Sequence, residues 1–291
     1  MYLQDSNSTG RLDVTKTWSF DSELTQSYTR VRQAFISDFL GEIQGQVTLR
    51  TAIDVGCGVG YFSKFLCDRG FLVVAVDGRD ENAKEGQRRY PEITFLTRDA
   101  EAASLPEIGI FDFVLSVGLL YHLENPFRAI RNLYALTGKV LIVESMCAPG
   151  PEPELLLLEE GQGHDQGLNY VALYPTEACL VKMLYRAGFP FVYGFDRLPP
   201  DVQFRTTLFR KQSRIFLAAS KVELSGRNLV LAKEPTRRIV GSSDLWATTL
   251  SRARDSCSGK LHAVRARLAR LFDPSRKMTA SRSSETDSNL K

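Results

Sequence analysis

Three glycines alternate with other residues where an apolar run ends. Residues 52–62 read Ala-Ile-Asp-Val-Gly-Cys-Gly-Val-Gly-Tyr-Phe, so Gly56, Gly58 and Gly60 occupy every second position. Glycine is needed where a backbone takes a positive φ or approaches a ligand closely, because it has no Cβ. The stretch predicts a strand, a tight turn and a helix, with the amides of the turn pressed against a cofactor.

The spacing of these glycines excludes a dinucleotide-binding turn. That turn requires Gly-x-Gly-x-x-Gly or Ala, and counting from Gly56 puts the bulky Tyr61 at the last position, whereas counting from Gly58 puts Ser63 there. The pattern is instead Asp-x-Gly-x-Gly-x-Gly, beginning at Asp54. The turn therefore does not have the glycine spacing that binding of a dinucleotide requires.

Two further acids follow apolar runs. Asp77 ends the run 71–76, where both carboxylate oxygens can accept hydrogen bonds from the two hydroxyls of a ribose, at about 1.5–3 kcal/mol for each charge-assisted bond. Asp99 comes just after the run 93–97. A structural role is open for both, as a helix cap or turn acid for Asp77 and as the cap of a short helix over 99–105 for Asp99.

The elements that must position these residues alternate along the chain. Continuous apolar runs are typical of strands buried on both faces of a parallel sheet, and residues recurring at three and four indicate helices. Such alternation predicts an α/β, Rossmann-like doubly wound sheet with ligands at the carboxyl ends of its strands. The expected strands are 52–55, 71–76, 93–97, 111–116, 140–144, 189–195 and 214–220, and the expected helices are 22–42, 61–69, 80–90, 126–136 and 175–188. The helix over 22–42 either covers the cofactor end of the sheet or only packs.

Residues 145–174 interrupt this alternation with three prolines and several glycines. A loop of that length in a compact domain is usually a lid, a binding element or disordered. Its place after the fifth strand favours a substrate lid, with a helical patch over 155–158.

Composition limits the class of protein. The 291 residues are 43% hydrophobic and 24% charged, which is typical of a globular protein, and the amino terminus has neither a leader pattern nor an apolar run of membrane-spanning length. Five scattered cysteines and three distant histidines predict neither a disulfide framework nor a metal site. We expect a cytoplasmic protein without a membrane span, of unknown oligomeric state.

Charge is distributed unevenly along the chain. Residues 221–291 hold 15 Lys and Arg residues against 7 Asp and Glu, whereas residues 1–220 hold 22 against 27. The tail also carries an apolar stripe from Leu261 to Phe272 at helical spacing. Such a helix could lie on nucleic acid, a membrane surface or a partner, or pack on its own domain. We expect an extension with a covering helix over 1–44, a cofactor domain over 45–220 and a basic, partly disordered extension over 221–291.

The glycine turn, Asp77, Asp99 and the order of strands together resemble the class I S-adenosylmethionine-dependent methyltransferases over about residues 45–220. The resemblance implies seven strands, the last antiparallel between the fifth and sixth, and S-adenosyl-L-methionine as cofactor. It implies contact of Asp77 with the ribose and of Asp99 with the adenine amino group. The full set of implied cofactor-binding residues is Asp54, Gly56, Cys57, Gly58, Asp77, Asp99, Ala100 and Val117.

Shorter motifs resemble one branch of that superfamily. Residues 120–126 read Leu-Tyr-His-Leu-Glu-Asn-Pro, and Pro175 and Ala187-Gly188-Phe189 follow, which is similar to the tRNA wobble-uridine carboxymethyltransferases and many bacterial relatives. The chain lacks the Asn/Asp-Pro-Pro-Tyr motif of amino-methylating nucleic-acid enzymes and the paired glutamates of the protein-arginine type. Those two substrate classes are therefore disfavoured.

Side chains near the expected transfer site suggest catalytic roles. His122 is the first candidate for a general base because histidine titrates near neutral pH, although a structural role is equally open. His164, in the expected lid, is the second candidate. Tyr121, Glu144 and Tyr170 are candidates for orienting the substrate.

Three functions fit these observations. The first is a methyltransferase that acts on an oxygen or nitrogen of a small metabolite, favoured by the acidic cofactor domain. The second is a tRNA-modifying methyl or carboxymethyl transferase of the wobble-uridine type, in which the basic tail contacts phosphates. The third is a cofactor-binding module without catalysis.

Overall fold

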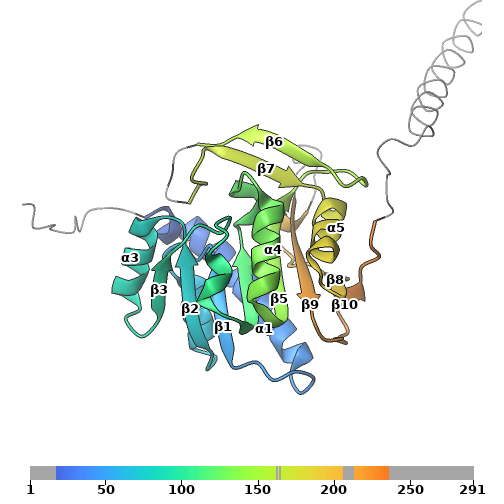
Figure 1. Ribbon diagram of the computed structural model, residues 1–291, viewed down its shortest axis with the longest axis horizontal. Helices are drawn as coiled ribbons and strands as arrows, with labels where there is room; N and C mark the ends of the chain where they lie inside the picture. Colours follow the sequence, from blue (N-terminus) through green and yellow to red (C-terminus); the bar gives the residue numbers. More distant parts are fainter. Residues whose placement is uncertain (1–17, 162, 164, 206–212, 236–291) are drawn as a thin grey trace, which may run out of the picture. The chain divides into compact units, whose positions relative to one another are not determined.

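The computed structural model describes residues 18–161, 163, 165–205 and 213–235. A large sheet and a separate two-stranded hairpin hold the strands, with helices on both faces of the sheet (Figure 1). The strands are β1 (Thr51–Val55), β2 (Leu72–Asp77), β3 (Thr94–Thr97), β4 (Phe111–Val117), β5 (Thr137–Cys147), β6 (Leu155–Glu159), β7 (Val171–Pro175), β8 (Phe191–Phe195), β9 (Ser213–Ser220) and β10 (Leu229–Leu231). The helices are α1 (Glu23–Ile43), α2 (Tyr61–Cys67), α3 (Asp80–Arg89), α4 (Pro126–Leu136) and α5 (Glu177–Ala187), with short 3₁₀ turns η1 (Ser19–Asp21), η2 (Leu105–Ile108), η3 (Leu120–His122) and η4 (Val202–Phe204).

The order of strands confirms the expected α/β class. The large sheet runs β10-β8-β9-β5-β4-β1-β2-β3. Strands β1 to β5 pair in parallel, whereas β9 is antiparallel to both of its neighbours, β5 and β8. This is the predicted place and direction of the last strand. The count differs by one, because β10 pairs antiparallel with β8 and extends the sheet to eight strands.

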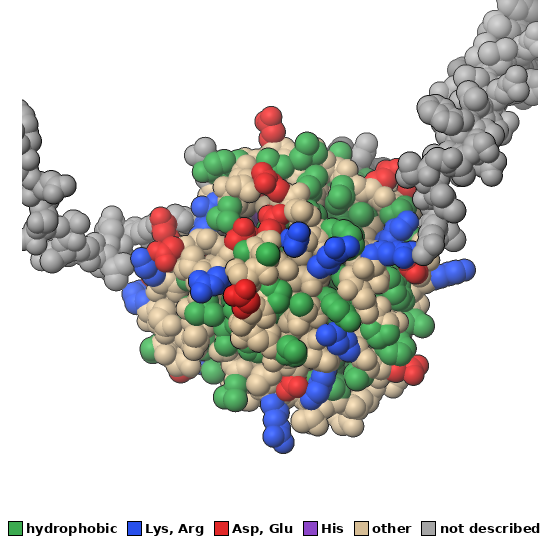
Figure 2. Space-filling view, in the orientation of Figure 1, with side chains coloured by type: hydrophobic (Ala, Val, Ile, Leu, Met, Phe, Trp, Pro, Cys, Tyr) green, Lys and Arg blue, Asp and Glu red, His purple; other side chains and the backbone are tan. Residues whose placement is uncertain are grey.

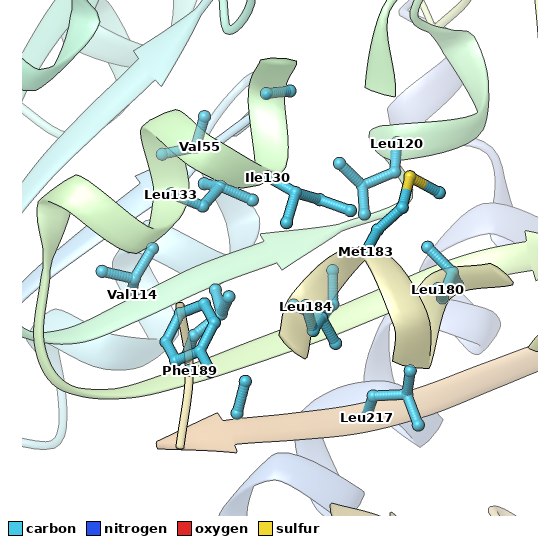
Figure 3. Close-up of a cluster of buried hydrophobic side chains, with 14 of the residues drawn as sticks. Val55, Val114, Leu120, Ile130, Leu133, Leu180, Met183, Leu184, Phe189 and Leu217 are labelled. Carbon is cyan, nitrogen blue, oxygen red and sulfur yellow. The ribbon is translucent and has the colours of Figure 1, made fainter. Parts of the chain in front are cut away.

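Alternating side chains of the central strands fill two cores. In β4, Phe113 and Leu115 point into a cluster with α1 and α2, and Val114 points into the opposite cluster with α4 and α5. Figure 3 shows the second cluster, where Ile130 and Leu133 of α4 meet side chains from the strands and from α5. Because both faces of the strand are covered, the strand reads as a continuous apolar run.

The prediction for residues 145–174 was wrong in two respects. Residues 155–158 form the strand β6 rather than a helical patch, and β6 pairs with β7 over the register Leu155↔Pro175 to Glu159↔Val171. Strand β5 also continues to Cys147, beyond the expected end at 144. The segment is therefore a hairpin, not an irregular loop, and in Figure 1 it runs across one end of the large sheet.

The chain beyond residue 220 still belongs to the fold. Leu224 is buried and its N–H donates to the Tyr193 hydroxyl at 2.9 Å, and β10 follows. Residues 1–235 and 236–291 form two separate units. The apolar and basic stripe predicted over 261–272 lies outside the described residues. Among the described helices, none has the length and apolarity that crossing a membrane requires.

Candidate cofactor and transfer site

The glycine turn after β1 has the predicted backbone conformation. Gly56, Gly58 and Gly60 have φ values of 82°, 55° and 93°. Residues that carry a Cβ adopt such positive φ values only at a cost in conformational energy. The N–H groups of Gly56 and Cys57 both donate to the Val76 carbonyl, at 2.8 and 3.0 Å. The turn thus folds back onto β2. Three of its residues, Gly56, Cys57 and Gly58, line a cavity of about 480 Å³.

Asp77 lies on the wall of this cavity with its carboxylate fixed. One oxygen accepts the Gly58 N–H at 2.8 Å, and the other accepts the Arg79 N–H at 2.9 Å and the Asn82 side-chain amide at 3.1 Å. Burial raises the pKa of Asp77, and these hydrogen bonds oppose the rise. Since a carboxylate offers about four lone-pair sites, roughly one is left for a ligand. The predicted contact with both ribose hydroxyls would require one of the present donors to move.

Asp54 does not reach the cavity wall. Its side chain is buried beneath the turn, where it accepts the Ser63 hydroxyl at 2.7 Å. Burial raises the pKa of Asp54 to about 7, and the charge of Asp77 adds to the rise while the Ser63 bond opposes it. Asp54 therefore supports the turn from below.

The turn after β3 and the end of β4 supply the remaining predicted contacts. Asp99 is exposed at the rim, and its Oδ1 accepts the Glu101 N–H at 2.8 Å. Its neighbour Ala100 and the strand-end residue Val117 are buried, and all three line the cavity. Asp99 forms this turn in place of the alternative helix over 99–105, since the 3₁₀ turn η2 begins only at Leu105.

The N-terminal segment closes one side of the cavity. The Phe20 ring lies against Gly58, where an added Cβ would come within 2.9 Å of it. Helix α1 contributes Thr25, Tyr28, Thr29 and Arg32 to the lining. Helix α1 therefore forms part of the cavity wall in addition to packing on the sheet.

A buried group of charges lies at one wall of the cavity, where Arg32 and Arg214 belong to the lining and Glu144 lies behind it. Glu144 of β5 is fully buried and accepts from Arg214 of β9 at 3.0 and 3.2 Å. Arg214 also donates to the Tyr121 hydroxyl at 3.0 Å, and Arg32 lies 3.8 Å from the Glu144 carboxylate and donates to Gln203 at 3.1 Å.

Two arginines share one directly paired carboxylate in this group. The Arg32 and Arg214 guanidinium groups stay charged and both lie within ion-pair distance of Glu144, and the charge of Asp201 also acts on Arg32. The Nε atoms of both arginines are buried without a hydrogen-bond partner. Burial lowers the pKa of Arg32, whereas for Arg214 the charge of Glu144 and the hydrogen bond to the Tyr121 hydroxyl outweigh burial and raise the pKa. An unpartnered buried donor is costly, so the wall is suited to an anionic group of a ligand.

The candidate catalytic residues have different surroundings. His122 lines the cavity, and its Nδ1 contacts the Glu160 carboxylate. Tyr121 is buried, with burial raising its pKa, and its ring lies 5.3 Å from that of Tyr174. Tyr170 is 46% exposed and lies outside the lining of the described cavity, and His164 is outside the described residues.

Sequence reasoning missed Phe20, Arg32, Gln203 and Arg214. The one available signal was a charged residue next to an apolar run, since Arg214 is the second residue of β9 and Glu144 lies in β5. In the described part of the chain, His, Cys, Asp and Glu side chains form no group of three or more that would hold a metal ion.

Comparisons with known proteins agree with this geometry. Residues 53–139 match the family model described as Methyltransferase domain. The tRNA U34 carboxymethyltransferase of Edwardsiella ictaluri (strain 93-146) is 29% identical over 163 residues, 53% of this chain and 49% of the relative. The protein of the same name from Shewanella woodyi (strain ATCC 51908 / MS32) is 32% identical over 149 residues, 48% of this chain and 44% of the relative. The chain spans about half the length of these relatives.

A solved structure shows the same fold. The N-terminal domain of EvdMO1 with SAH bound superposes with a TM-score of 0.54 at 17% identity, covering 65% of this chain and 80% of that domain. At this identity the likeness concerns the fold, and the chemistry of this chain has to be argued from its own side chains.

Proposed function

We propose that the chain binds S-adenosyl-L-methionine, or a donor of the same type that bears a carboxymethyl group, and transfers the methyl or carboxymethyl group. The chain carries a methyltransferase domain of the class I fold. One observation carries the proposal: the glycine turn, Asp77 and the Asp99 turn line a single cavity at the carboxyl ends of adjacent parallel strands. The proposed cofactor contacts are Gly56, Cys57, Gly58, Asp77, Asp99, Ala100 and Val117.

The cavity suits this cofactor in shape and in donor set. Its volume of about 480 Å³ lies within the ~300–1,000 Å³ range of small-molecule sites. The turn offers backbone without side chains at Gly56 and Gly58, and Asp77 offers a fixed anion for hydroxyl groups. When bound, S-adenosyl-L-methionine supplies a carbon already activated by the adjacent sulfonium. The protein then has to orient the acceptor and remove its proton where the acceptor carries one.

The relatives favour a tRNA acceptor over the small metabolite that the acidic domain suggested. Their name specifies U34 of tRNA and a carboxymethyl group. The buried Arg32 and Arg214 support the carboxymethyl part of this proposal independently, because a carboxylate could accept hydrogen bonds from their unpartnered Nε donors, whereas a methyl group could not. We therefore place a tRNA-directed carboxymethyl or methyl transfer first and a carboxylate-bearing small acceptor second.

The direct test follows label in the transferred group. Donors labelled in a methyl group or in a carboxymethyl group are incubated with the protein and cell extract, which is then separated into RNA, protein and small molecules. Label in tRNA supports the first acceptor, and label in the small-molecule fraction supports the second. Absence of label from all three fractions, with both donors, would contradict transferase activity.

Arg214 provides a test of the proposed anion site. Arg214→Lys keeps the charge but loses the fork that reaches both Glu144 and Tyr121. We expect a carboxymethyl donor to bind about tenfold or more weakly to this variant while S-adenosylmethionine binding changes less. Equal losses for both donors would show that Arg214 acts only on the structure of the site.

A further inference from the structure

The tip of the β6–β7 hairpin lies on the cofactor side of the cavity. The Arg79 guanidinium group, two residues after Asp77, donates to the Gln166 carbonyl at 3.2 Å and to the Gly167 carbonyl at 2.7 Å. The Leu168 side chain lies against Gly78, where an added Cβ would come within 2.9 Å of it. Residues far from β2 in sequence therefore cover the end of β2.

A single carboxylate fixes the tip on the opposite side. Glu160 follows β6, and its side chain is only 6% exposed. One of its oxygens contacts His122 Nδ1, and the other accepts the Gly167 N–H at 2.8 Å. Glu160 thus connects the tip of the hairpin to η3, at the end of β4.

The tip fits closely over η3. A Cβ on Gly167 would collide with the backbone carbonyl oxygen of His122 and would lie 2.8 Å from a Glu160 oxygen. Gly161, in the same connection between the two strands, has no atom within 4 Å of the place of a Cβ. Close approach of the backbone therefore requires a glycine at Gly167 but not at Gly161.

The opposite end of the hairpin is continuous with the core. Ala148 forms a bridge with Thr176, the Thr176 N–H donates to the Glu154 carbonyl at 2.9 Å, and its hydroxyl donates to the Glu152 carbonyl at 2.6 Å. The base is thus held by backbone pairing next to β5 and α5, whereas the tip is held by the side chains of Arg79 and Glu160. Figure 1 shows the intervening strands crossing the end of the sheet.

We propose that the β6–β7 hairpin is a lid over the cofactor end of the cavity, latched by Glu160 between His122 and Gly167. The proposal rests on the proposed function, since it assumes that an S-adenosylmethionine-type molecule enters and its spent form leaves beneath the lid. His122 is then a positioning residue that acts through Glu160. Lids of this kind exclude water and set the rate of product release.

The kinetic test uses the two glycines as a matched pair. S-adenosylhomocysteine dissociation is measured by stopped flow for the full-length wild type, Gly167→Ala and Gly161→Ala. Because only the first substitution displaces the tip, we expect it to raise the dissociation rate about tenfold and the second to leave it unchanged. Equal dissociation rates for wild type and a folded Gly167→Ala would overturn the lid.

A second measurement does not depend on any ligand. Amide hydrogen exchange of peptides covering Gly167 is compared in ligand-free wild type, Glu160→Ala and Glu159→Ala. Loss of the carboxylate that accepts the Gly167 N–H should accelerate exchange in the Glu160→Ala variant. Substitution of Glu159, the exposed last residue of β6, should have no effect. Unchanged exchange in Glu160→Ala would overturn the latch.

The two measurements separate this proposal from the proposed function. Failure of wild type to bind S-adenosylhomocysteine would contradict the proposed function and the lid's part in cofactor release. Faster exchange in Glu160→Ala would in that case still support the latch. If wild type binds S-adenosylhomocysteine and Gly167→Ala releases it at the same rate, the proposed function stands and the lid is rejected.

Discussion

Two buried acids end neighbouring strands of the site, and their environments differ. Asp77 accepts three hydrogen bonds from Gly58, Arg79 and Asn82, whereas the Asp54 side chain accepts from Ser63. Burial raises the pKa of both groups, and it raises that of Asp54 to about 7. Asp77, whose carboxylate accepts more hydrogen bonds, faces the cavity. Asp54, whose carboxylate accepts fewer, lies beneath the turn and supports it.

The raised pKa of Asp54 predicts a pH-dependent stability. Its ordinary value is 3.8, so between about pH 4 and 7 the folded state binds more protons than the unfolded state. The free energy of unfolding should therefore fall as pH rises through this window, by at most about 1.4 kcal/mol for each pH unit from this group, and level off above it. Asp54→Asn, which is neutral throughout, should show a shallower fall in urea unfolding.

The control for this measurement is Asp68→Asn. Asp68 lies at the end of α2 with its side chain 56% exposed, and it should keep the wild-type dependence on pH. An Asp54→Asn protein whose stability changes with pH as steeply as that of wild type would show that Asp54 is already ionised in the folded state.

At this scale the sequence predicts local features better than distant ones. Positive φ at Gly56, Gly58 and Gly60 follows from residue type, and the place of Asp77 follows from the end of an apolar run. By contrast, Arg32 and Arg214 are 182 positions apart and meet only because α1 and β9 approach the same end of β5. No local pattern encodes that meeting.

At the scale of helices and strands, an ion pair between η1 and α3 fixes the N-terminal segment at one wall of the site. Asp21 of η1 forms two hydrogen bonds of 2.7 Å with the Arg89 guanidinium group at the end of α3. It also accepts the Tyr61 hydroxyl at 2.6 Å. The bond with Arg89 lowers the pKa of Asp21 in spite of partial burial. These contacts fix Phe20 against the glycine turn.

Removal of this ion pair should loosen the segment without unfolding the domain. We expect Asp21→Ala to increase cleavage by protease near residues 18–22 and to weaken S-adenosylhomocysteine binding less than about tenfold, because the pair is partly exposed. Limited proteolysis and calorimetry measure the two effects. Asp38→Ala, on the exposed side of α1, is the matched control, and equal behaviour of the two variants would contradict a role for the pair.

The β6–β7 hairpin shows why a helical patch was wrongly predicted for residues 155–158. Four consecutive leucines give neither a period of two nor one of 3.6, so a short strand and a helical turn cannot be distinguished by pattern. Leu155, Leu156 and Leu157 remain 43–65% exposed, and pairing with β7 decides their conformation. The place of this segment after β5 follows from the sequence, but its contacts with Arg79 and His122 do not.

For the whole molecule, the distribution of charge bears on the acceptor. On the face in Figure 2, Lys and Arg side chains are interspersed with Asp and Glu. Residues 236–291 carry the surplus of basic residues and are a separate unit from residues 1–235. Any electrostatic contact with tRNA phosphates should therefore depend strongly on those last residues.

Deletion of residues 236–291 tests this dependence. A cut at 221 would remove β10 and the buried Leu224, so the boundary at 236 is the appropriate one. We expect the shortened chain to keep its cofactor affinity and to lose both tRNA affinity and most of its salt dependence in filter binding. Unchanged tRNA binding would contradict a role of these residues in RNA recognition.

The central claim is that the glycine turn and Asp77 hold an S-adenosylmethionine-type cofactor, and calorimetric titration tests it most directly. S-adenosylhomocysteine is titrated into wild type, Asp77→Asn and Asp80→Asn, the last an exposed acid at the start of α3. We predict one site in wild type, affinity about 10- to 100-fold weaker in Asp77→Asn, and little change in Asp80→Asn. No binding to wild type, or undiminished affinity in Asp77→Asn, would contradict the account.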